Sequence, residues 1–480
     1  MRGLRFPPLA VVILIMAGRL HADDVIRTVA GTGVSGFNGD GIPAVSAWID
    51  DPRGVVADAT GNVYLADYGN HRVRRVDAAT GTITTVAGSA TWTGGYNGDG
   101  IQAADARLNG PRGLAFDGAG RLLIADHGNN LVRRVDLISG VITTVAGSMT
   151  ATGGYGGDGA AATSALLSGP TGLAVDASGD LWVADEDNNA IRRVDHATGF
   201  ISTAAGTGSL GYNGDGISAT TAELYWPYDV AVDAAGNVYI ADTGNSRIRK
   251  VTAGTGAIST VSGDGSFDYN GDGIPAGLAK LSMPGGIVLD ASGNLWLADV
   301  LNHRVRRIDA ATGTITTMAG SGAAGFTGDG MAATEARLYN PYDVALTPSS
   351  GFFIADGNNH RIRGVAPPAS TPSPTTVNVR KGAVLAAPSV LDLRVPGSRV
   401  TFHVRGNPGA VTEVRVWDAA GNLLGAIPIQ LDADGRGEGV LTPDGLNGKR
   451  PGLGLYWVKA RGGGVDGHSR FLVTDGDAGR

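Results

Sequence analysis

The stretch VYLADYGNHRVRRVDAATGTITTVAG, residues 63–88, contains three short apolar segments separated by turns. Residues 63–67 and 82–88 are rich in apolar and β-branched side chains, and residues 72–76 alternate basic and apolar side chains with the period of a half-buried strand. The segment 54–58 just before them has the composition of a further strand. Together these residues predict one four-stranded antiparallel sheet.

This unit recurs six times along the chain. Each copy opens with a proline, and the aspartate of an Asn-Gly-Asp-Gly-like loop lies 12 residues before it. A period of 57 to 59 residues suits the blades of a β-propeller better than the turns of a solenoid. The prolines are Pro52, Pro111, Pro170, Pro227, Pro284 and Pro341, and the loop aspartates are Asp40, Asp99, Asp158, Asp215, Asp272 and Asp329.

The two ends of the repeat array complement each other. The sixth copy stops after residues 361–365 and lacks a fourth strand, whereas residues 26–31 are a fourth strand without a blade. We expect this N-terminal strand to join the last blade, because closing the ring removes the exposed edges of an open array. The predicted fold class is therefore all-β, a six-bladed β-propeller closed by an N-terminal strand.

The repeats resemble NHL repeats. The motif Asp-x-x-Asn-His-Arg stands at residues 67–72, 299–304 and 356–361, and the other three copies keep its frame. The insert with Gly-aromatic-x-Gly-Asp-Gly resembles the long-loop variety of bacterial exported proteins and of teneurin-type propellers. The resemblance covers about residues 25–365 and implies a six-bladed propeller. At the His position, the other copies carry Asn130, Asn189 and Ser246.

Residues 1–22 have the pattern of a signal peptide, with Arg2 and Arg5 before an apolar run at 9–17 and a cleavage site after Ala22. An uncleaved N-terminal anchor is the weaker alternative, because the run is short for a bilayer. We therefore expect an exported protein, periplasmic or extracellular, with no stable membrane span in the mature chain. A net charge of -7 argues against nucleic acid as a partner.

A second domain is expected after the propeller. Residues 366–376 are rich in Pro, Ser and Thr and predict an extended linker. Alternating strands follow, and residues 414–423 (VRVWDAAGNL) with Gly454-Leu455-Tyr456 resemble the Ig-like domain of flagellar hook-capping proteins, although Pro443 stands where that family often has Trp. The predicted organisation is a signal peptide (1–22), a propeller (23–365), a linker (366–376) and an Ig-like β-sandwich (377–480).

The recurrent polar residues are more economically explained by structure than by catalysis. Asp67, Asn70 and Arg74 recur in every blade, as expected of a turn-capping hydrogen-bond set. Each Gly-Asp-Gly loop offers one dependable carboxylate and an aromatic anchor, which favours a packed loop over a calcium site. No cofactor is predicted, and Ca²⁺ or another divalent metal is the alternative. His71, His303 and His360 share one repeat position, so we do not expect them to converge on one metal.

Function in a near-symmetric ring is expected where the symmetry breaks. Strand direction places the entrance to each innermost strand and the turn after each second strand on one face, which we call the upper face. At both places the six copies differ, and no catalytic residue is assigned there. The binding candidates are Arg53, Arg112, Tyr228, Asp229, Tyr342 and Asp343 at the channel mouth, with His127, Glu186 and Asp187 after the second strands.

These residues leave two functions open. The first is an exported binding or scaffold protein whose upper face recognises a protein, a glycan or a small molecule, since arginines beside tyrosines fit an acidic or sugar-like ligand. The second is a metal-dependent hydrolase or lyase of the gluconolactonase-like or amidating-lyase-like propeller type, with the acidic candidates and His127 as ligands or acid-base groups. RNA binding, as in some animal NHL proteins, conflicts with export and with the net charge.

Overall fold

The computed structural model describes residues 24–366 except 92, 150–152, 328 and 348–350, and beyond residue 390 it describes seven strands. The predicted signal peptide and residues 367–376 of the predicted linker lie outside the described residues. The chain divides into two compact units, Met1–Thr371 and Pro372–Arg480. Among the described residues no α-helix occurs, and no helix is long and apolar enough to cross a membrane.

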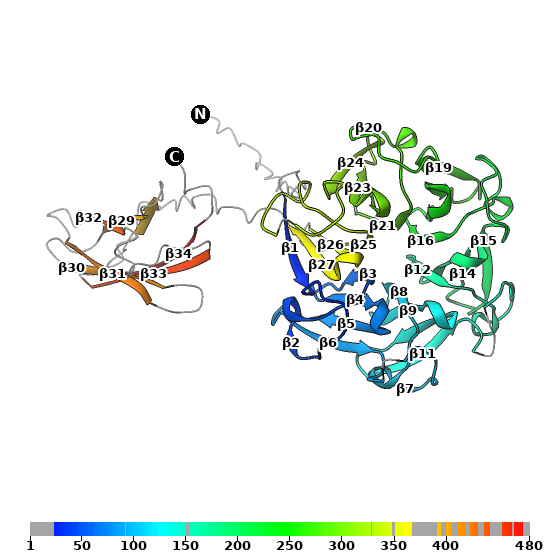
Figure 1. Cartoon of the computed structure of the whole chain (residues 1–480), viewed down its shortest axis with the longest axis horizontal. Coiled ribbons are helices and arrows are strands. Elements are labelled where there is room, and N and C mark those ends of the chain that lie inside the picture. The colour runs from blue at the N-terminus through cyan, green and yellow to red at the C-terminus, as the bar shows by residue number, and fades with distance from the viewer. Residues whose placement is uncertain are drawn as a thin grey trace, which may run out of the picture. The chain divides into compact units, whose positions relative to one another are not determined.

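The first unit is a six-bladed β-propeller, as predicted (Figure 1). Blade one contains β3 (Pro52–Ala57), β4 (Val63–Asp67), β5 (Arg72–Val76) and β6 (Thr82–Ala87), and blade two contains β8 (Pro111–Phe116), β9 (Leu122–Asp126), β10 (Leu131–Val135) and β11 (Val141–Ala146). Blade three contains β12 (Pro170–Val175), β13 (Leu181–Asp185), β14 (Ala190–Val194) and β15 (Ile201–Ala205), and blade four contains β16 (Pro227–Val232), β17 (Val238–Asp242), β18 (Arg247–Val251) and β19 (Ile258–Ser262). Blade five contains β21 (Pro284–Leu289), β22 (Leu295–Asp299), β23 (Arg304–Ile308) and β24 (Thr314–Ala319), and blade six contains β25 (Pro341–Leu346), β26 (Phe352–Asp356), β27 (Arg361–Ala366) and β1 (Val25–Ala30).

Short elements lie in the connections between these strands. Two-residue strands extend blades one, two and five, namely β2 (Ile42–Pro43), β7 (Ile101–Gln102) and β20 (Ile274–Pro275). Single 3₁₀ turns lie in the inserts: η1 (Ala44–Ser46), η3 (Ala103–Asp105), η5 (Ala162–Ser164), η7 (Ala219–Thr221) and η9 (Ala276–Leu278). Others follow the second strands: η2 (Tyr68–Asn70), η4 (His127–Asn129), η6 (Glu186–Asn188), η8 (Thr243–Asn245), η10 (Val300–Asn302) and η11 (Gly357–Asn359).

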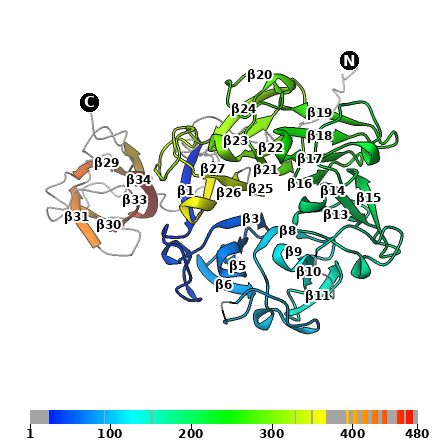
Figure 2. The same ribbon diagram turned by 45° about the vertical axis from the view of Figure 1, so that its right-hand side comes forward.

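The N-terminal strand closes the ring. β1 pairs antiparallel with β27, from Val25 opposite Ala366 to Ala30 opposite Ile362, and both views show them side by side (Figures 1 and 2). The innermost strands contact one another in the order β3, β8, β12, β16, β21, β25 and back to β3. The side chain of Ile26 is fully buried in a core that it shares with Trp296 of blade five and Phe352 of blade six. The prediction of N-terminal closure is confirmed.

A repeated polar network ties each long insert to its blade. In blade one, Asn70 donates to the carboxylate of Asp67 at 2.8 Å and to the carbonyl of Gly36 in the insert at 2.7 Å. Arg74 is fully buried, donates to the Gly39 carbonyl at 2.6 Å and pairs with Asp40. An Arg–Asp ion pair of this kind joins the insert to the blade in all six copies. This confirms the prediction that the repeated polar residues have a structural role. The other pairs are Arg133–Asp99, Arg192–Asp158, Arg249–Asp215, Arg306–Asp272 and Arg363–Asp329.

The repeated histidines connect neighbouring blades. Nδ1 of His71 accepts the backbone N–H of Gly110 at 2.9 Å, and Nδ1 of His360 accepts that of Asp51 at 3.1 Å. Asn130 uses its side-chain oxygen in the same way on Gly169. These histidines lie at separate blade boundaries, as their shared repeat position predicts.

The second unit contains two antiparallel sheets. One has the order β28 (Leu391–Arg394), β29 (Val400–Arg405), β32 (Arg436–Leu441), and the other has the order β31 (Leu423–Gln430), β30 (Val411–Trp417), β33 (Gly454–Gly462), β34 (Val465–Val473). This unit is therefore β-structured in its described part, and the Ig-like sandwich stays a prediction.

Candidate functional site

The two symmetry-breaking positions of the upper face meet at the channel mouth. The guanidinium of Arg53, which follows the proline of blade one, lies 4.2 Å from the ring centre of Tyr68 and 4.6 Å from that of Tyr342. Tyr68 follows the second strand of blade one, and Tyr342 follows the proline of blade six. Cation–π contacts therefore join residues that are distant in sequence into one cluster.

Both arginines of the mouth already have acidic partners. Arg112 of blade two forms an ion pair with Glu186 of blade three, with 2.5 Å between Nη1 and Oε2. Arg53 pairs with Asp51 at 2.8 Å. Burial raises the pKa of the Glu186 carboxyl, and the charge of Arg112 opposes that shift. The expected attraction of an acidic ligand to these two arginines is thus reduced by the ion pairs that they form within the protein.

His127 lies next to this ion pair as a neutral imidazole. Burial, together with the positive charge of Arg112, lowers the pKa of His127 to about 4. Its Nδ1 atom and the hydroxyl of Tyr228 are both buried, and neither has a hydrogen-bond partner among the described residues. Burial also raises the pKa of the Tyr228 phenol, so the hydroxyl keeps its proton and is a free donor at neutral pH.

Asp229 and Asp343 lie just inside the channel, at a position where the other blades have glycine. Asp229 accepts the backbone N–H of Ile287 in blade five at 2.7 Å, and Asp343 accepts that of Val55 in blade one at 2.8 Å. Burial raises the pKa of both carboxyls, that of Asp343 to about 7, and the negative charge of Asp343 raises the pKa of Asp229 further. No lysine or arginine in the described part of the chain forms an ion pair with either carboxylate.

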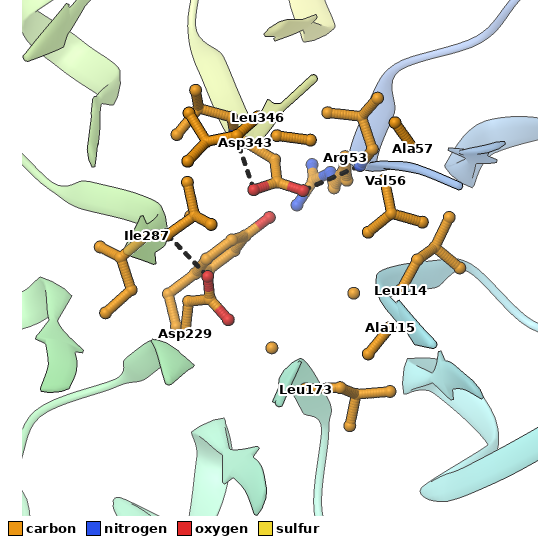
Figure 3. A pocket seen from close by; sticks show the side chains of 18 of the residues that line it. Arg53, Val56, Ala57, Leu114, Ala115, Leu173, Asp229, Ile287, Asp343 and Leu346 are labelled. Carbon is orange, nitrogen blue, oxygen red and sulfur yellow. Dashed lines mark hydrogen bonds between the residues drawn. The ribbon is translucent and has the colours of Figure 1, made fainter. Parts of the chain in front are cut away.

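These carboxylates face a cavity of about 310 Å³ in the central channel, lined by all six innermost strands (Figure 3). Its polar groups are Arg53, Tyr228, Asp229 and Asp343 near the upper end. The walls below are apolar and include Val55, Leu114, Leu173, Ile287 and Val344. The cavity therefore combines donors and acceptors at one end with an apolar tube.

The nine candidate residues divide into three groups. Arg53, Tyr228, Asp229 and Asp343 line the cavity. Arg112, His127, Glu186 and Tyr342 surround its upper end through contacts with one another and with Arg53. Asp187 is exposed and accepts only a long hydrogen bond from Ser168, at 3.4 Å. Within the described ranges, no group of three or more His, Asp or Glu side chains could hold a metal ion.

One upper-face residue escaped the sequence analysis. The residue before each repeat proline adopts a left-handed backbone conformation, and in blade four this residue is Trp226, with φ of 49° and 43% of its surface exposed. A bulky residue rarely adopts this conformation. The signal was present in the sequence, because Gly110 and Gly169 occupy the equivalent positions of blades two and three.

The family model of the NHL repeat matches this chain at residues 50–76, 167–193 and 224–251. These segments cover the first three strands of blades one, three and four. The first unit is thus a six-bladed propeller that contains NHL repeats. The six-bladed ring of the structure agrees with the presence of NHL repeats, and so do the relatives described next.

Three known proteins illustrate the relationships of this NHL propeller. NHL repeat-containing protein 2 of Bos taurus is 25% identical over 406 residues, covering 76% of this chain and 54% of that protein. Teneurin-1 of Mus musculus is 26% identical over 362 residues, covering 66% of this chain and 12% of that protein. The chain thus spans about half or less of these relatives. An auxiliary nutrient binding protein of Bacteroides ovatus superposes with a TM-score of 0.53 at 18% identity, covering 72% of this chain and 77% of that one, which shows a shared fold.

Proposed function

We propose that this protein is an exported binding protein whose central channel takes a small zwitterion with an apolar side chain, the class to which free apolar amino acids belong. The observation that carries the proposal is the Asp229–Asp343 pair. Two half-buried carboxyls face an open cavity, and among the described residues they have only backbone N–H donors as partners. A ligand that brings a positive charge to them relieves their repulsion.

The rest of the cavity supports the same class of ligand. The unpartnered hydroxyl of Tyr228 is a donor at the same end of the channel and suits a carboxylate, and Arg53 lies beside it with its charge partly compensated by Asp51. The apolar walls below suit a hydrocarbon side chain. A binding role also agrees in kind with the nutrient binding protein that shares the fold. Export and an Ig-like docking module at residues 377–480 belong to the same proposal.

The test is calorimetric titration of the full exported chain with L-leucine and with two analogues that each lack one charge, isoamylamine and 4-methylpentanoate. We expect leucine to bind best, because each analogue leaves one polar group of the cavity without a partner. Asp343→Asn should weaken leucine binding at least about tenfold. Asp187→Asn is the matched control, since it makes the same change on the same face but outside the cavity, and it should bind as the wild type does.

Proton linkage gives a second readout. Because the carboxyls hold their protons up to a raised pKa, leucine should bind more tightly as the pH rises from 5 to 8 and should release protons on binding. A rise in the melting temperature of the protein with Ca²⁺ or Zn²⁺, together with no binding of leucine, would favour the metal-dependent hydrolase or lyase. A rise in the melting temperature with sugars alone, and of the same size at every pH, would favour a glycan ligand.

A further inference from the structure

Aromatic side chains fill the seams between blades, and one seam lacks its aromatic. The second residue of each second strand packs against the next blade: the ring centre of Tyr64 lies 5.2 Å from that of Phe116, and Trp296 lies 5.1 Å from Phe352. Five of the six residues at this position are aromatic, and the sixth is leucine. In chain order they are Tyr64, Leu123, Trp182, Tyr239, Trp296 and Phe353.

The leucine coincides with an open groove. Between blades two and three lies a groove of about 700 Å³, bordered by the turns at 117–121 and 195–199 on the face opposite the channel mouth. Its apolar floor includes Leu123, Leu181 and Val194. Leu123 itself is buried against Leu181 and Val194 of blade three, and the groove opens beside it toward Arg134. The groove is therefore an open space beside the one second-strand position that has no ring.

The cationic partner of the missing ring is still present. Arg134 pairs across the strands with Leu123. In blades three, four and five the equivalent basic group lies over the ring: Arg193 is 5.7 Å from Trp182, Lys250 is 5.2 Å from Tyr239, and Arg307 is 5.8 Å from Trp296. Arg134 therefore keeps the geometry of a cation over an aromatic site whose ring is missing.

Arg134 also lacks the ion pair that the equivalent arginines of blades one and three form with a nearby aspartate among the described residues. Arg75 and Arg193 form ion pairs with Asp77 and Asp180, whereas no ion pair or hydrogen bond joins Arg134 to any described residue. Two acids act on the charge of Arg134: Asp117 is engaged by Arg121 at 2.7 Å, and Asp136 accepts hydrogen bonds from its own turn at Ile138 and Ser139. Asp195, on the opposite rim, accepts hydrogen bonds from its own turn at Thr198.

We infer that this groove binds a small aromatic carboxylic acid, with its ring in the groove beside Leu123 and its carboxylate paired with Arg134. An indole acid is a suitable probe, because Trp182 places an indole at the equivalent position of blade three, where its N–H donates to the turn aspartate Asp176 at 2.9 Å. This site is independent of the channel and of the function proposed for it.

The probe is indole-3-acetate, titrated into the full chain by calorimetry and by ligand-observed NMR. Tryptophol, which has the same ring with a hydroxyl in place of the carboxylate, is the matched compound. Leu123→Trp restores the aromatic found in the other seams and should fill the groove, while Arg134→Gln removes only the cation. Asp187→Asn, exposed on the channel-mouth face and outside the groove, is the control variant and should leave binding unchanged.

We expect indole-3-acetate to bind the wild type, and Leu123→Trp to weaken this binding more than about tenfold while the protein melts at or above the wild-type temperature. Arg134→Gln should lose about tenfold for indole-3-acetate and little for tryptophol. Equal binding by wild type and Leu123→Trp, or no binding by the wild type at millimolar probe, would overturn the inference. If Leu123→Trp melts lower than the wild type, Leu123→Phe provides the same test with a smaller ring.

Discussion

Ile26 provides the sharpest test of ring closure, because it lies in the strand that comes from the other end of the propeller sequence. Its side chain is fully buried and its backbone lies opposite Val365 of blade six. Truncating a buried isoleucine to alanine costs about 2–5 kcal/mol. We expect Ile26→Ala to lower the free energy of unfolding by about 3 kcal/mol, measured by urea denaturation of the full chain followed by tryptophan fluorescence.

The chain offers a matched control for this change. Ile83 occupies the same position in the fourth strand of blade one, is also fully buried and lies opposite Val76, but its strand continues directly from its own blade. If β1 is an integral part of the ring, Ile26→Ala and Ile83→Ala should cost similar amounts. A loss below about 1 kcal/mol for Ile26→Ala, beside a full loss for Ile83→Ala, would refute the reasoning. Removing residues 23–31 should then also leave the propeller intact, whereas closure predicts global destabilisation and aggregation through the exposed edge of β27.

Three further predictions concern the interior. Arg74→Met should cost about 3–5 kcal/mol of unfolding free energy in urea, because it leaves the buried Asp67 without its cation, and a cost near that of a surface change would contradict this. Trp296→Leu should open a groove at the seam of blades five and six and cost about 2–4 kcal/mol, and added indole should restore part of the lost melting temperature. The unfolding free energy should fall as pH rises between about 4 and 7, because native Asp343 still holds a proton that the unfolded chain has released. The slope that this one group contributes is at most about 1.4 kcal/mol per pH unit. Asp343→Asn should remove this contribution, so the variant should gain stability relative to the wild type from pH 5 to pH 8, and the opposite trend would disprove the assignment.

Local chemistry explains why so much of the fold could be predicted. Asp67, Asn70 and Arg74 act within one blade, on hydrogen bonds to turns and inserts that lie close in sequence. Six copies of that set mark the blades, and the unmatched strand at residues 26–31 marks the closure. The nine upper-face candidates were found in the same way, by comparing equivalent positions.

What the sequence by itself determined is the repeat, the number of blades and the face on which symmetry breaks, since these follow from spacing and strand direction. Only the tertiary structure decided which candidates act together. Arg112 meets Glu186 and Asp229 reaches Ile287 across blade boundaries, and such contacts depend on how neighbouring blades pack. The groove beside Arg134 has the same origin, because the space left at a seam depends on how closely the facing blade packs against residues such as Leu123.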